Sequence, residues 1–223
     1  MNSSWSSVVT ELIPLALVIA LSPLSIIPAV LVLHSPRPRP AGLGFLLGWL
    51  VGLVVLTTVF VEVSSLLGGM HDKPPSWASW ARVVIGAALI VFGIYRWVTR
   101  HTKPHQMPGT QHITEAGPVK AFAVGAILTV ANPKVLFICA AAGLALGSAG
   151  LRPAGVWTGE LAFVLVSAST VALPILAYLV SGERLDPALA RLKDWMEKHN
   201  GALVAVILVV IGLLVLYKGI HGI

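Results

Sequence analysis

The sequence predicts an all-α integral membrane protein with six transmembrane helices, arranged as two inverted repeats of three helices each. Three observations predict this fold class: the composition, the length of the apolar blocks, and motifs that recur in the two halves. Of the 223 residues, 57% are apolar and 11% are charged, whereas a soluble domain carries about a quarter charged residues. Too few charges remain to cover a water-facing surface, which excludes a soluble enzyme, a disordered chain and a disulfide-stapled secreted domain.

The apolar residues form six blocks, each near the length of about 20 residues that a membrane-spanning helix needs. We expect spans over residues 8–33, 41–67, 80–98, 119–147, 153–180 and 202–217. No Lys or Arg precedes Arg37, so the first block lacks the positively charged start of a cleaved signal peptide. We therefore expect the first block to remain in the protein as a span.

The basic residues at the ends of the blocks predict the orientation of the chain. The segments that follow the first, third and fifth blocks carry ten Lys and Arg residues, and the segments on the opposite side carry four. Because basic residues are enriched in cytoplasmic loops, this asymmetry places both termini outside the cytoplasm. The same scattered distribution indicates contact with membrane lipids and gives no sign of nucleic-acid binding.

Two connecting segments have a character of their own. Residues 101–118 are polar and contain Pro and Gly, as expected of a flexible cytoplasmic loop between the first repeat (1–100) and the second (119–223). Residues 186–199 predict an amphipathic helix that ends at Gly201. This helix either lies on the inner leaflet or packs on the bundle as a linker.

Short motifs recur in the same order in both halves of the chain. The pairs are residues 21–24 with 131–134, 39–42 with 152–155, and 91–94 with 210–213. Because each half has three spans, an odd number, the two halves enter the membrane in opposite directions. Inverted repeats with interrupted helices near the midplane are typical of secondary transporters; the alternative is a membrane scaffold built on a duplicated three-helix unit.

Prolines within spans one and four mark the expected helix interruptions and the candidate substrate site. Pro23 and Pro133 lie at mid-depth of their spans. A proline has no N–H, so the carbonyl group one turn earlier loses its hydrogen bond and must be satisfied by protein or water. Ser22 and Asn132 directly precede them, placed to bond either the loosened backbone or a substrate. Pro28 is a weaker candidate, and simple kinks are the alternative for all of these prolines.

Lys134 and Glu160 are the candidate ionisable residues within the spans. A charge at the centre of a span is costly, so Lys134 is expected to face the interior of the bundle with a partner. Glu160, about two turns into span five, is the nearest candidate counterion. Such a pair could couple transport to protons or form a static salt bridge. Glu62, nearer an outer span end, is a weaker candidate for a proton path.

Glycines four residues apart predict close helix packing, and several kinds of chemistry have no sequence support. Gly44, Gly48 and Gly52 form one small-residue face, and Gly143 with Gly147 a second, suited to contacts within one chain or in a homo-oligomer. The sequence contains no P-loop, nucleophile elbow or HExxH motif. We therefore expect a protein that is not an enzyme, with no catalytic residues, cofactor or metal.

The motif set resembles the glycolipid-addressing family, also called the sulfolipid-addressing family, of the lysine-exporter superfamily. The resemblance is carried by residues 21–28, 35–39 and 44–49 together with the Asn-Pro-Lys motif at 132–134. It implies an inner-membrane protein of actinobacteria that helps carry glycolipids or peptidoglycolipids toward the cell surface. It also implies lipid-synthesis or large lipid-transport membrane proteins as partners.

The resemblance assigns a central site to Ser22, Pro23 and residues 132–134, whereas Glu160 is a candidate from burial alone. We therefore expect a membrane transporter of glycolipids or peptidoglycolipids, with proton coupling as a candidate energy source. Two alternatives stay open. One is an exporter of amino acids or small ions, as elsewhere in the superfamily; the other is a non-transporting scaffold for lipid-synthesis machinery.

Overall fold

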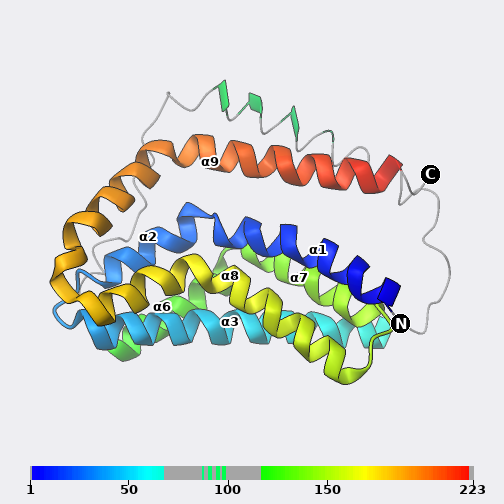
Figure 1. Cartoon of the computed structure of the whole chain (residues 1–223), viewed down its shortest axis with the longest axis horizontal. Coiled ribbons are helices and arrows are strands. Elements are labelled where there is room, and N and C mark those ends of the chain that lie inside the picture. Colours follow the sequence, from blue (N-terminus) through cyan, green and yellow to red (C-terminus); the bar gives the residue numbers. More distant parts are fainter. Residues whose placement is uncertain are drawn as a thin grey trace. The chain divides into compact units, whose positions relative to one another are not determined.

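The computed structural model describes residues 2–67 and 117–220, with a few single helical residues between 87 and 98 (Figure 1). Contacts divide the chain into one unit of Met1–Gly69 with Met107–Lys193 and a second unit of Met70–Gln106 with Asp194–Ile223. Every regular element within the described ranges is a helix. Most of the expected third span and nearly all of the expected linker at 101–118 lie outside the described residues.

The first expected span consists of two helices, α1 (Asn2–Ala20) and α2 (Pro23–Val32), bent by 49°. Pro23 begins α2, and because proline has no N–H it cannot donate to the carbonyl of Ile19. The N–H of Ser22 donates to that carbonyl instead, at 3.1 Å. The interruption therefore lies where the sequence predicts it.

The fourth expected span is interrupted in the same way. Helix α6 (Pro118–Ala131) ends before Asn132, α7 (Pro133–Ser148) begins after it, and the two axes differ by 71°. Asn132 has extended backbone angles, and its side-chain oxygen accepts the N–H of Lys134 at 3.1 Å. This bond is an N-cap, which satisfies one of the free donors at the start of α7.

Two long helices run without a break. They are α3 (Pro38–Leu67) and α8 (Pro153–Ser181), of 30 and 29 residues. At 1.5 Å per residue each extends about 45 Å, which exceeds the hydrocarbon thickness of about 30 Å. Both are apolar enough to cross a membrane, and each bent pair adds a candidate span when counted as one. The described residues thus form a helical membrane protein with two to four candidate spans.

The C-terminal part of the described chain differs from the prediction. A short 3-10 helix, η1 (Gly182–Leu185), leads into α9 (Asp186–Ile220), which continues for 35 residues through Gly201. The expected amphipathic helix at 186–199 and the expected span at 202–217 are therefore one helix. A single interior glycine costs only about 1 kcal/mol relative to alanine, and no proline follows it to end the helix.

Helix α3 is the centre of the first unit, since it packs against α2, α6, α7 and α8. Its glycine face meets α6 directly: side chains on Gly44, Gly48 and Gly52 would collide with Pro118, Phe122 and Thr129. The order of these contacts shows that α3 and α6 run parallel.

The second glycine face packs on the same helix. A Cβ on Gly143 of α7 would lie 2.6 Å from the carbonyl oxygen of Thr57, and one on Gly147 would lie 2.5 Å from the Cβ of Ser64. Both glycine faces therefore serve contacts within one chain, which decides between the two uses that the sequence left open.

We predict that Gly48→Ala destabilises the protein by about 1–3 kcal/mol, the usual cost of overpacking. The added methyl would meet the backbone carbonyl of Phe122, which cannot move without separating α3 from α6. Thermal unfolding of the purified protein in detergent measures the effect. Gly117→Ala is the matched control, because no described residue lies within 4 Å of a Cβ at that position. Equal melting temperatures for both variants would contradict the close helix contact.

Candidate functional site

The two helix interruptions lie halfway along the uninterrupted helices. Gly52, near the midpoint of α3, lies against Thr129, which is three residues before Asn132. The hydroxyl of Thr170, near the midpoint of α8, donates to the carbonyl of Ala20, the last residue of α1. We call this level of the first unit the break level.

The two interrupted helices run in opposite directions. Val8 and Glu11 of α1 line the same hollow as Leu144 and Ser148 of α7. Pro23 lies about 15 residues after Val8, and Pro133 lies about 15 residues before Ser148, which is about 22 Å along each helix. Helix α1 begins near this shared hollow and α7 ends there. The breaks of the two antiparallel helices therefore lie at the same depth.

Polar side chains are buried at or near the break level. They are Ser22, Ser25, Thr129, Asn132 and Ser167. Three polar groups in this region have no hydrogen-bond partner within the described part of the chain: the hydroxyls of Ser25 and Ser167 and the indole N–H of Trp49. A buried polar group without a partner costs about 1–3 kcal/mol, and natural proteins rarely keep one without a reason. No described residue uses the hydrogen-bonding capacity of these groups.

The candidate residues from the sequence occupy distinct places in this arrangement. Ser22 is the N-cap residue of α2, yet its hydroxyl makes no capping hydrogen bond. Pro28 is buried within α2, and Glu62 is exposed on α3. Pro23 and Pro133 start the second helix of each bent pair.

Lys134 lies in the first turn of α7, directly after the interruption, and is half-buried. Its ammonium group forms no salt bridge with any residue that the structure describes. The amino-terminal end of a helix carries a partial positive charge, so the start of α7 does not offset the positive charge of the Lys134 ammonium group. Lys134 and the start of α7 together form a positive region beside the break.

Glu160 is buried on α8, and its carboxylate accepts a hydrogen bond of 2.7 Å from the hydroxyl of Thr58 on α3. The expected salt bridge with Lys134 is not formed. Gly159, next to Glu160, lies against Leu146, which is twelve residues after Lys134 on α7. That separation is about 18 Å along the helix, more than two side chains can span. Glu160 thus belongs to a level between the breaks and the end of α7.

Several polar residues of this site have no counterpart in the sequence-based prediction. They are Ser25, Trp49, Thr58, Thr129, Ser167 and Thr170. The spacing of Ser167 and Thr170, three apart within an apolar helix, is the signal that could have identified the face of α8 that meets the break.

A family model described as "Sap, sulfolipid-1-addressing protein" matches residues 12–221, almost the whole chain. The chain belongs to the sulfolipid-1-addressing protein family. This match confirms the family resemblance of the sequence motifs, and it includes both interrupted helices and α3 and α8. No curated protein and no solved structure matches the chain. Family membership and the apolar helices together indicate a membrane protein with a role in addressing sulfolipids or related glycolipids.

We predict that Thr58→Val destabilises this family member by about 1–3 kcal/mol, because it leaves the buried Glu160 carboxylate without its hydroxyl donor. Thr158→Val on α8 is the control, since that threonine is exposed and its hydroxyl bonds only the carbonyl of Ala154. Chemical or thermal unfolding in detergent compares the two variants. Equal stability of both would show that the Thr58–Glu160 bond contributes nothing.

Proposed function

We propose that this chain is a membrane transporter that moves the polar headgroup of a glycolipid or peptidoglycolipid across the inner membrane toward the cell surface. In this proposal the chain acts without enzymatic chemistry and together with lipid-synthesis or large lipid-transport membrane proteins. Two three-helix repeats of opposite orientation form the transporter, and α1–α2 and α6–α7 are their corresponding interrupted helices. Family membership supports the lipid substrate, and the opposite directions of the two bent pairs support the inverted arrangement.

The observation that carries the proposal is the set of unpaired hydroxyls at the break level. Ser25 and Ser167 are fully buried and lack partners among the described residues. A sugar headgroup offers both donors and acceptors to such hydroxyls and to the amide of Asn132. A static scaffold would gain nothing from unpaired polar groups at mid-membrane depth, where they are most costly.

Charge adds a second element to the proposed mechanism. The positive region formed by Lys134 and the start of α7 attracts an anionic part of the headgroup toward the break level. The acyl chains stay in the bilayer beside the apolar outer faces of the helices. Because Glu160 lies about 18 Å from Lys134 along α7, proton coupling would act through helix movement rather than through a direct ion pair.

We expect Lys134→Met to reduce surface delivery of the lipid by about tenfold or more, a factor that corresponds to about 1.4 kcal/mol. Ser167→Ala should reduce it several-fold. Ser169→Ala is the matched control, because that hydroxyl already bonds the carbonyl of Val166 on its own helix. The measurement compares surface-extractable with total lipid in a deletion strain complemented by each variant.

The same assay separates the proposal from its alternatives. Full delivery by Lys134→Met, combined with loss of delivery when residues 101–116 are removed, would indicate the scaffold. Unchanged surface lipids in the deletion strain itself would indicate an exporter of amino acids or small ions. Membrane insertion of each variant is checked by its amount in the membrane fraction.

The proposed orientation, with both termini outside the cytoplasm, makes a separate prediction. The single cysteine, Cys139, is buried, so Cys139→Ser gives a background without thiols. In that background, a membrane-impermeant maleimide should label Ser148→Cys in intact cells, whereas Ser181→Cys should react only after permeabilisation. Both serines are exposed, at the ends of α7 and α8. The reverse pattern would invert the topology.

A further inference from the structure

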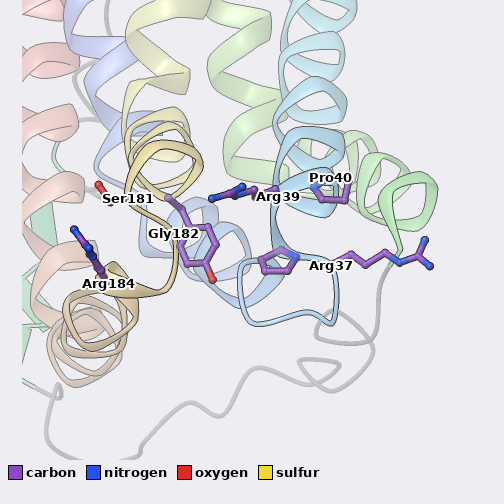
Figure 2. Close-up of a pocket in the computed structure, with 8 residues that line it drawn as sticks. Arg37, Arg39, Pro40, Ser181, Gly182 and Arg184 are labelled. Carbon is purple, nitrogen blue, oxygen red and sulfur yellow. The ribbon is translucent and has the colours of Figure 1, made fainter.

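A hollow of about 580 Å³ lies where α3 begins and α8 ends. Figure 2 shows its lining residues, which are Arg37, Pro38, Arg39, Pro40, Tyr178, Ser181, Gly182 and Arg184. We propose that this hollow binds the sulfate or phosphate ester of an anionic lipid headgroup. Under the proposed function this hollow is a loading site, the place where the lipid first binds before transport, and only this role rests on the proposed function. The binding of the ester itself is independent of transport.

The sequence brings the arginines together through two local features. Arg37 and Arg39 flank Pro38, whose fixed backbone angle starts α3. Arg184 follows Gly182, which has φ 58°, a value that favours glycine. A Cβ on Gly182 would lie 3.5 Å from a terminal nitrogen of Arg39. In Figure 2 the Arg39 side chain extends toward Ser181 and Gly182, whereas Arg37 points away from them.

The charge of the hollow is uncompensated within the described part of the chain. Three arginines line it, all three are exposed, no carboxylate is among its lining residues, and none of the three makes a salt bridge with a described residue. Positive charges around one hollow repel one another, and a bound anion reduces that cost. The planar fork of arginine matches the paired oxygens of sulfate and phosphate esters.

The backbone at the start of α3 contributes few donors, so the side chains must supply the recognition. Pro38 and Pro40 have no N–H, and the N–H of Ala41 already donates to the carbonyl of Arg37 at 3.1 Å. The positive end of the helix adds a general attraction for anions. This arrangement selects for an ester that several guanidinium groups can share.

The position of the hollow favours a lipid over a free anion. It lies at one end of two helices that are long and apolar enough to cross the membrane. Pro38, Pro40 and Tyr178 give its wall an apolar part beside the arginines. The acyl chains of a lipid whose ester is held there would lie at the depth where the apolar faces of α3 and α8 begin. The volume of the hollow is within the usual range for small-molecule sites.

The test uses the purified full-length protein in detergent and its thermal unfolding temperature. Dioctanoyl phosphatidic acid should raise this temperature in a concentration-dependent way, because a ligand that binds only the folded state stabilises it. Dioctanoylglycerol, which has the same chains without the ester, and inorganic phosphate should give little shift at equal concentration. A shift of equal size with dioctanoylglycerol would overturn the proposal, and an equal shift with inorganic phosphate would show a free-anion site instead of a lipid site.

Variants assign the binding to the hollow. Arg39→Gln and Arg184→Gln should each weaken the apparent affinity for phosphatidic acid about tenfold, as expected for the loss of one charge-assisted bond. Arg39→Lys, which keeps the charge but loses the fork, should give an intermediate loss. Arg191→Gln on α9 removes the same charge outside the hollow and should leave the affinity unchanged. Unchanged binding in both Arg39→Gln and Arg184→Gln would overturn the assignment.

The design keeps this inference separate from the proposed function. Ser169→Ala, whose hydroxyl already bonds the carbonyl of Val166, lies outside both sites and should bind phosphatidic acid and deliver lipid as the wild type does. Loss of lipid binding in Arg39→Gln with normal surface delivery would overturn the loading role alone. Normal binding in every arginine variant would overturn the site and leave the transport proposal standing.

Discussion

The close contact between the backbone of α3 and that of α6 is the constraint on which the rest of the first unit depends. Gly44 and Gly48 lie against the backbone carbonyls of Pro118 and Phe122, and Gly52 lies against the side chain of Thr129, so the register of α3 on α6 is fixed largely by backbone contacts. That register sets Thr129 beside the middle of α3 and thereby places the interruption at Asn132 at half depth. The same helix then receives α7 through Gly143 and Gly147, despite the 71° bend between α6 and α7.

Both helix interruptions leave backbone groups without helical hydrogen bonds, and different side chains bond these groups at the two breaks. A proline removes a backbone donor, and an apolar environment offers no water to replace it. At the first break, a hydroxyl from another helix, Thr170 of α8, bonds the carbonyl of Ala20. At the second, the side chain of Asn132 caps its own helix by accepting the N–H of Lys134. The first break therefore combines a local bond, from the N–H of Ser22 to the carbonyl of Ile19, with a tertiary contact, whereas the bond at the second break is local. A movement of α8 relative to α1 would break the tertiary contact at the first break.

Polar and charged groups divide among three levels of the first unit. Arginines gather at the end where α3 begins, hydroxyls and an amide gather at the breaks, and the Thr58–Glu160 bond lies beyond the breaks toward the end of α7. The surroundings of the two inner levels are apolar, so each polar group there must be paired within the protein or by a bound molecule. Thr58 and Glu160 are paired with each other, whereas the arginines and the break-level hydroxyls have capacity left for a ligand.

The sequence alone determined the class of protein, the positions of both helix interruptions and the family, because these depend on local properties. Apolar length sets a span, a mid-span proline ends a helix, and short motifs identify relatives. Tertiary structure decided what the glycine faces contact, which partner Glu160 has, and which buried hydroxyls gather at the breaks. The sequence suggested Lys134 as the partner of Glu160, since both lie within spans, but the register of α7 on α8 separates them by about 18 Å. Likewise, Gly201 was expected to end a helix, yet α9 continues through it, because one glycine is too weak a signal when helix-forming residues follow. Side-chain partners depend on the relative depth of helices that are distant in sequence, and no local pattern encodes that depth.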